Sequence, residues 1–282
     1  MKLFFYSWIL LVCTPVMAQN AAFGLFTGTG KKSSFEKMAA AAGSTDIILF
    51  GEYHDNPICH WMQLELSKHL AAKQSLTLGA EMIETDNQRA LDDYLAGTIN
   101  QKQLDTLARL WQNYATDYKP LVDFAKERKL RFVATNIPRR YASMVAKKGL
   151  ESLSALPAEE KAWMMPLPMP YDGNLPGYVN MMKMMGEHAT ENFPKAQAVK
   201  DATMAHFILK NLETGKVFLH FNGTYHSDNY EGIGWYLKKY NPSVRVVTIA
   251  TVEQEDVTKL EAEHRGKADF ILVVDKDMTK TF

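Results

Sequence analysis

Short apolar segments that alternate with helical patterns limit this chain to one fold class. Continuous apolar runs occur at 46–50, 76–80, 131–135, 217–221, 244–250 and 270–274. Strands that are covered by helices on both faces have this continuous apolar character. Helical patterns lie over 58–73, 86–96, 101–113, 120–128 and 196–212. This order predicts an α/β fold with a mostly parallel sheet flanked by helices.

One long interval interrupts the alternation of strands and helices. About eighty residues separate the third expected strand from the fourth, and they contain no strand pattern. A connection of this length is too long for an irregular loop in a compact domain. We therefore expect a smaller helical lobe at about 139–212, inserted into an α/β domain that spans 19–282.

The N-terminus has the order of features that is typical of a signal peptide. Lys2 precedes a short apolar stretch, and Val16-Met17-Ala18 provides a cleavage site after Ala18. We expect residues 1–18 to be removed and the protein to be exported, to the periplasm or the cell surface. Cys13 follows Val12, where a lipid-attachment motif requires a small residue, so a lipid anchor is less expected. The alternative is a buried N-terminal helix or strand.

Charge and cysteine content argue against a nucleic-acid-binding protein and against a fold held together by disulfides. The 32 basic and 32 acidic residues balance, and no basic run favours nucleic acid. After removal of the leader, Cys59 is the one remaining cysteine, so the fold does not depend on an internal disulfide. We interpret the Cys59 thiol as a small buried apolar side chain. Because Cys59 lies next to His60, a nucleophilic thiol is the alternative.

Polar side chains follow four of the expected strands, at the point where each strand ends. Glu52 and His54 follow the first strand, Glu81 the second, Arg139 the third and His226 the fourth. The carboxyl ends of parallel strands meet at one edge of a sheet, where ligands of open α/β folds bind. The sequence therefore predicts a single cleft that these five residues surround.

Two of these segments share the pattern G-x-x-H, at Gly51 to His54 and at Gly223 to His226. Glycine at the strand end is expected to allow a sharp turn. Imidazoles and carboxylates together can bind a divalent metal or act as acid and base without one. A structural polar network is the third interpretation. The candidate metal ligands are Glu52, His54, Glu81 and His226, and the candidate catalytic residues are these four with Arg139.

The expected lobe is rich in methionine and contains two tyrosines of interest. Tyr178, Met181, Met182 and Met185 fall on one face of a predicted helix. Ordinary packing between helices explains such a face most simply. An adaptable apolar surface for a flat ligand or a partner is the functional alternative, and a methionine-rich copper site is a weaker one.

Five segments together resemble the ChaN-like family of the haem-binding uptake and Tiki superfamily. They occur in the family's order and span most of the chain: LFGEYHDNPICHWMQ, LGAEMIETDNQ, VATNIPRRYASMVAKKGLESL, AQAVKDATMA and FNGTYHSDNYEGIG. The resemblance implies a parallel α/β domain with a smaller helical lobe. It also implies export and a link to iron acquisition, with an outer-membrane haem or iron receptor as partner. The cleft positions that match the family are Glu52, His54, Asp55, Glu81, Arg139, Asp201 and His226.

Some members of the family bind haem at a dimer interface through a tyrosine, so the resemblance implies a haem site and a homodimer. The candidates for this site are Tyr171, Tyr178, Met182 and His188. Related Tiki proteins are metal-dependent peptidases with similar G-x-x-H motifs. We therefore expect a haem-binding protein of an iron-uptake system, with a metal-dependent hydrolase that uses the Glu/His cleft as the alternative. A purely structural or partner-binding role is the third hypothesis.

Overall fold

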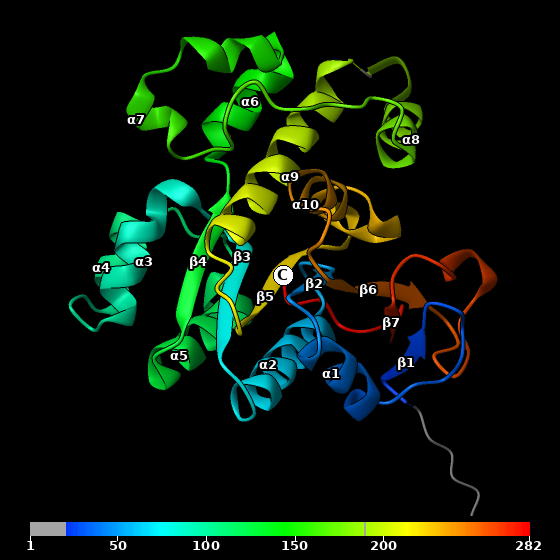
Figure 1. Cartoon of the computed structure of the whole chain (residues 1–282). Helices are drawn as coiled ribbons and strands as arrows, with labels where there is room; N and C mark the ends of the chain where they lie inside the picture. Colours follow the sequence, from blue (N-terminus) through cyan, green and yellow to red (C-terminus); the bar gives the residue numbers. More distant parts are fainter. Residues whose placement is uncertain (1–20, 189) are drawn as a thin grey trace, which may run out of the picture.

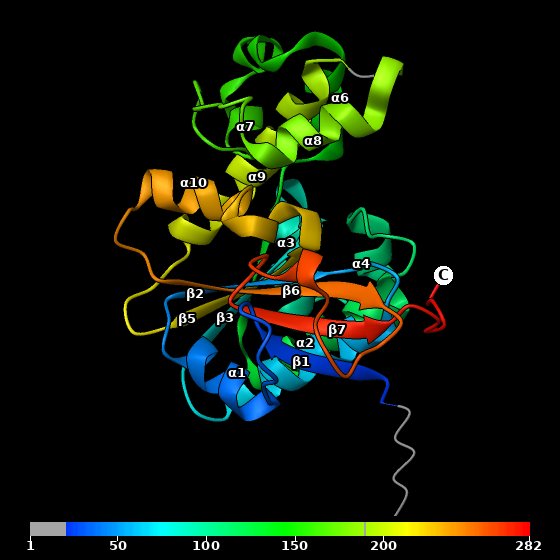
Figure 2. The same cartoon turned by 90° about the vertical axis from the view of Figure 1, so that its right-hand side faces the viewer.

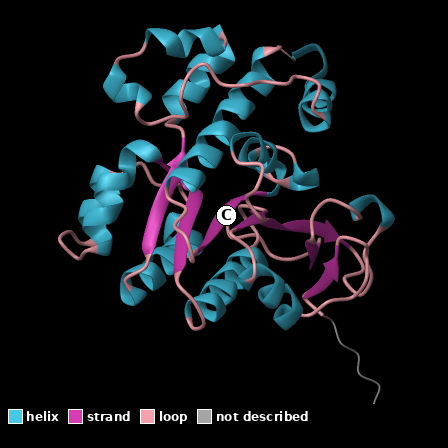
Figure 3. Ribbon diagram, viewed as in Figure 1, coloured by secondary structure: helices cyan, strands magenta, loops and turns pink. Residues whose placement is uncertain are grey.

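A seven-stranded, mostly parallel sheet forms the centre of the molecule (Figures 1 and 3). The computed structural model describes residues 21–188 and 190–282. The strands are β1 (Phe23–Thr27), β2 (Ile47–Glu52), β3 (Leu76–Glu84), β4 (Arg131–Asn136), β5 (Val217–Gly223), β6 (Val246–Gln254) and β7 (Phe270–Asp275). Their order across the sheet is β1-β7-β6-β2-β5-β3-β4, and β1 alone runs antiparallel to its neighbour. The predicted fold class is confirmed, although the sequence patterns missed β1.

Helices cover both faces of this sheet and explain why the strands are continuously apolar. The α-helices are α1 (Phe35–Gly43), α2 (Pro57–Ala71), α3 (Gln88–Leu95), α4 (Gln101–Leu107), α5 (Lys119–Arg128), α6 (Arg139–Lys148), α7 (Ala158–Lys161), α8 (Pro176–Met185), α9 (Asn192–Lys210) and α10 (Ile233–Tyr240). One core joins α1 to α5 with the sheet face that includes Phe50 and Phe132. A second core joins α6, α9 and α10 with the opposite face, which includes Leu49 and Val133.

The connection between β4 and β5 contains α6, α7, α8 and α9, with short 3-10 turns between them. Helix α9 packs against β4 and also contacts α6, α8 and α10. Figure 2 shows α6, α7 and α8 in a layer beyond α9 and α10, away from the sheet. The long interval of the sequence therefore adds helices beyond the carboxyl end of β4, next to the edge where ligands bind.

Two helix ends depart from the expected positions. Helix α4 stops at Leu107 instead of continuing to 113, because Ala108 is extended and the Arg109 amide donates to Asn87 Oδ1 at 3.3 Å. Helix α2 is capped by Asn56, whose side chain accepts from two amides, with Pro57 in the first turn. Asp55 does not cap this helix and lies 3.5 Å from Lys280 Nζ.

The expected signal peptide lies outside the described residues. Within the part of the chain that is described, no helix is long and apolar enough to cross a membrane.

Candidate functional site

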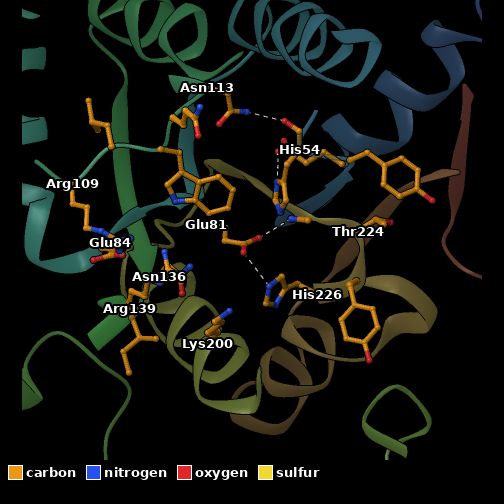
Figure 4. A pocket seen from close by; sticks show the side chains of 18 of the residues that line it. His54, Glu81, Glu84, Arg109, Asn113, Asn136, Arg139, Lys200, Thr224 and His226 are labelled. Carbon is orange, nitrogen blue, oxygen red and sulfur yellow. Dashed lines mark hydrogen bonds and ion pairs between the residues drawn. The ribbon is translucent and has the colours of Figure 1, made fainter. Parts of the chain in front are cut away.

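A pocket of about 770 Å³ lies at the carboxyl ends of β2, β3, β4 and β5 (Figure 4). All five predicted cleft residues line it, namely Glu52, His54, Glu81, Arg139 and His226. The segment after α4 closes another side with Arg109, Leu110, Trp111, Gln112 and Asn113. Parallel strands therefore bring together residues that are up to 174 positions apart, Glu52 and His226.

The two G-x-x-H segments lie side by side because β2 and β5 pair in register. Gly51 lies opposite Asn222, and Glu52 lies opposite Gly223. A Cβ atom on Gly51 would lie 2.8 Å from the Thr224 Cα, and one on Gly223 would lie 2.8 Å from His54 Nε2. Neither glycine has a positive φ. Glycine is therefore required at these two positions because the segments approach each other closely. The sharp turn that was expected is not the reason.

A buried hydrogen-bond network holds His54 in the pocket. Its Nδ1 donates to Glu52 Oε1 at 2.8 Å, and the Tyr118 hydroxyl donates to the same oxygen at 2.8 Å. Gln63 Nε2 donates to the other carboxylate oxygen, Glu52 Oε2. The Trp111 ring packs edge-on against the imidazole with 4.8 Å between centroids. With Nδ1 engaged, His54 Nε2 is the nitrogen that faces the pocket beside Gly223.

A second network places His226 between two carboxylates. His226 Nε2 lies 3.1 Å from Glu81 Oε1, and its Nδ1 lies 2.5 Å from Asp201 Oδ1 on α9. The amide of Gly223 donates to Glu81 Oε2 at 2.7 Å, and the Tyr178 hydroxyl donates to Asp201 Oδ2 at 3.1 Å. All of these side chains are buried. The network ties β3, β5, α8 and α9 together at the floor of the pocket.

Burial and charge shift the pKa of each group in these networks. Burial alone would lower the pKa of His226, but Glu81 and Asp201 outweigh it and raise the pKa to about 10. Burial would raise the pKa of Glu81, but the charge of His226 and its hydrogen bond hold that pKa well below its usual range. Burial raises the pKa of Asp201, and His226 only partly offsets this effect. At neutral pH, His226 is therefore an imidazolium that lies between the carboxyl groups of Glu81 and Asp201.

The pKa of His54 is also raised. Burial opposes the rise, but the hydrogen bond to Glu52 and the charges of Glu81 and Glu52 outweigh burial. Its side chain is 33% exposed, so the imidazole reaches solvent in the pocket while its partner Glu52 is fully buried. This arrangement can accept or donate a proton at Nε2, because Nδ1 is held by a carboxylate.

The candidate metal ligands do not form one set around a central point. Both nitrogens of His226 contact carboxylates, and both oxygens of Glu52 and of Glu81 accept hydrogen bonds or pair with histidine. Their donor atoms therefore do not fit a divalent ion as the side chains lie. In the described ranges, one group of three acidic or histidine side chains has its ligand atoms within 4.8 Å of one another. This group is Glu261, Glu263 and His264, and it does not line the pocket.

None of the four candidate haem residues lines the pocket. Tyr178 is 3% exposed and its hydroxyl contacts Asp201, so it supports the pocket floor from α8. Tyr171 stacks on Tyr178 with 5.8 Å between ring centroids and is half-buried. Met182 is half-buried, and His188 is exposed at the turn after α8. These side chains lie along or beside one helix.

Sequence patterns missed several residues outside the strand ends that line the pocket or hold its side chains in place. Tyr118 belongs to a single π-helical turn over Tyr114–Tyr118, a type of turn that is frequent at functional sites but has no simple sequence signal. Arg109 and Trp111 lie where a helix was expected. Lys200 comes from α9, one residue before Asp201, and only the family resemblance drew attention to that segment.

The fold and the pocket define a class of α/β protein in which charged and aromatic side chains line a ligand-sized pocket at the carboxyl edge of the sheet. The chain belongs to the family described as haem-binding uptake, Tiki superfamily, ChaN, which it matches over residues 38–237. No curated protein matches the sequence.

Solved structures show the same fold. A structure of ChaN of Campylobacter jejuni with cofacial haem binding superposes with a TM-score of 0.69 and 18% identity, covering 91% of this chain and 98% of that one. A succinoglycan biosynthesis protein gives a TM-score of 0.53 at 11% identity, covering 90% and 94%. The type III effector HopBA1 gives 0.51 at 10% identity, covering 86% and 93%.

Proposed function

We propose that this protein binds haem and serves haem or iron uptake outside the cytoplasm. The observation that carries the proposal is membership of the ChaN family across residues 38–237, which include the pocket walls and α8. The structural relative from Campylobacter jejuni binds haem in cofacial pairs, which supports the same ligand here. The proposal includes export directed by residues 1–18, pairing of two copies, and exchange of haem with an outer-membrane receptor.

The exposure of each tyrosine side chain decides whether it can ligate haem iron. A tyrosine phenolate is an established axial ligand. Burial raises the pKa of Tyr171, Tyr178 and Tyr225, but Tyr178 is unsuited because it is only 3% exposed and its hydroxyl is hydrogen-bonded to Asp201. Tyr171 is half-buried and stacks on Tyr178 of α8, a helix whose Met184 and Met185 are exposed and offer a soft apolar surface. Tyr225 is 44% exposed at the pocket rim, where its hydroxyl donates to the Gly177 carbonyl at 2.6 Å.

The iron ligand is tested with three phenylalanine variants. Ferric haem is titrated into Tyr171→Phe, Tyr225→Phe and Tyr178→Phe, and ligation is followed by absorbance and resonance Raman spectroscopy. Loss of the tyrosinate signature is expected in Tyr171→Phe or in Tyr225→Phe. The signature is expected to persist in Tyr178→Phe, which is the matched control from the same tyrosine pair. Retention in both of the first two variants would contradict this assignment.

A second candidate function is hydrolysis by general acid–base catalysis, and the geometry of His54 favours it. A buried carboxylate orients Nδ1, and Nε2 faces the pocket, as expected for a base that activates water. Purified protein is assayed on aryl esters and short peptides. Turnover should disappear in His54→Ala and persist in His69→Ala, whose histidine lies outside the pocket. Equal turnover in both variants would rule out His54 as the base.

A further inference from the structure

Two cationic side chains on one side of the pocket have no acidic partner. Arg139 stands at the start of α6 and Lys200 lies on α9, and both line the pocket (Figure 4). Within residues 21–188 and 190–282, neither has a carboxylate oxygen within 4.0 Å or a side-chain hydrogen bond. Their nearest sequence neighbours of the same type are paired: Arg140 with Asp86, and Lys195 with Glu191. Arg139 and Lys200 therefore bring positive charge to the pocket that no ion pair offsets, whereas the neighbouring cations on α6 and α9 are paired.

The acidic residues of the pocket are committed to other partners. Glu84 pairs with Arg109, Glu81 pairs with His226, and Glu52 accepts from His54 and Tyr118. Glu84 lies opposite Asn136 in the pairing of β3 with β4, and its pKa is raised by burial although Arg109 and the backbone amide of Arg139 oppose the rise. None of these carboxylates forms an ion pair with the side chain of Arg139 or Lys200, so both cations remain free to meet a ligand in the pocket.

Asn136 gives an independent indication of a ligand at the same place. It ends β4, lines the pocket and is only 8% exposed. Its Oδ1 is buried without a hydrogen-bond partner among the described residues. Buried amide groups are nearly always satisfied, so this amide points to a polar group missing from the pocket wall. Its Nδ2 forms no hydrogen bond with the described residues and is not enclosed, so it can donate to an anion without any rotation of the amide.

The backbone adds positive potential on this side of the pocket. Helix α6 has ten residues and begins at Arg139, so the positive end of its dipole lies beside the Arg139 side chain. Figure 4 shows the Lys200 side chain, which comes from α9, on the same side of the pocket as Asn136 and Arg139. A planar guanidinium suits bidentate binding of a carboxylate or phosphate, and an ammonium adds a point charge.

We propose that Asn136, Arg139 and Lys200 form an anion subsite that binds a carboxylate or phosphate group of the pocket ligand. The inference goes beyond haem binding, because it assigns a ligand chemistry to the pocket whatever residue ligates iron. Two sources offer this chemistry: the propionates of haem, or a small free organic anion. His54 and Trp111 line the same pocket and can contact the rest of such a ligand.

The subsite is tested by calorimetric titration of the purified protein with inorganic phosphate and with succinate at low salt. Saturable binding is expected for wild type. The double variant Arg139→Gln/Lys200→Gln should bind at least about tenfold more weakly, equivalent to about 1.4 kcal/mol. The matched control Arg140→Gln/Lys195→Gln removes the neighbouring cations and should bind as wild type does. Absence of binding to wild type, or equal binding to both double variants, would overturn the proposal.

A second arm distinguishes the two sources of the anion. Haem and haem dimethyl ester, which lacks the propionate charges, are each titrated into wild type and Arg139→Gln/Lys200→Gln. A preference of wild type for haem that the double variant loses identifies the propionates as the bound groups. If wild type and the double variant prefer haem over its ester to the same extent, and only the variant has lost phosphate binding, the subsite binds a free anion and not the propionates. Binding of phosphate without any binding of haem would retain the subsite and remove the proposed haem function.

Discussion

Replacement of His226 by glutamine tests whether the charge network at the pocket floor stabilises the fold. The imidazolium lies 3.1 Å from Glu81 and 2.5 Å from Asp201, and all three groups are buried. Removing one member of a buried ion pair leaves an uncompensated charge and costs about 3–5 kcal/mol. We therefore expect His226→Gln to lower the free energy of unfolding by about 3–5 kcal/mol at pH 6.5, measured by urea denaturation.

The pH dependence of this effect has a defined sign. The folded pKa of His226 is raised from its ordinary 6.5 to about 10, so its stabilisation is complete below pH 6.5 and is lost as the pH approaches 10. The difference in stability between wild type and His226→Gln should accordingly shrink between pH 6.5 and pH 10. A double-mutant cycle with Glu81→Gln should give a coupling of about 2 kcal/mol.

The control for this experiment is His206→Gln, which lies on α9 like Asp201 but does not line the pocket. Its expected cost is within about 0.5 kcal/mol, as for other substitutions outside special features. A cost below about 1 kcal/mol for His226→Gln, or a difference that grows as the pH rises, would refute the assignment of a buried imidazolium.

Three further predictions follow from the packing. Gly223→Ala places a Cβ 2.8 Å from His54 Nε2 and should cost about 1–3 kcal/mol in denaturant unfolding; a neutral effect would show that His54 moves freely. Burial raises the pKa of Cys59 to about 12, so a thiol reagent at pH 8 should modify it only after denaturation, and rapid native modification would contradict this. Burial lowers the pKa of His220 to about 4, so wild-type stability should fall between pH 6.5 and 4, and His220→Gln should lessen that slope; equal slopes would contradict the burial of a neutral imidazole.

Much of the site follows from the order of strands along the chain. Glu52, Glu81 and His226 each end or follow an apolar run, and parallel pairing alone is sufficient to bring them to one edge. Glu81 and Glu84 both reach the pocket because the register of β3 and β4 shifts between Ala80 and Glu84. That irregularity depends on long-range packing, and residue periodicity does not reveal it.

Other features depend on contacts that local patterns do not encode. The role of Asp201 requires α9 to lie across the end of β5, and Tyr118 reaches Glu52 only through the π turn before α5. Strand β1 was missed because it is short and pairs antiparallel with β7, at the far end of the chain. Tyr178 was a reasonable haem candidate from its place among methionines, but its burial against Asp201 is a property of the folded structure.

Whether this protein binds haem is decided by an absorbance titration of the purified wild-type protein with ferric haem. We predict a saturable spectral change with a defined stoichiometry and with features of tyrosinate ligation. A titration that gives only the spectrum of free haem at every ratio would show that the protein does not bind haem.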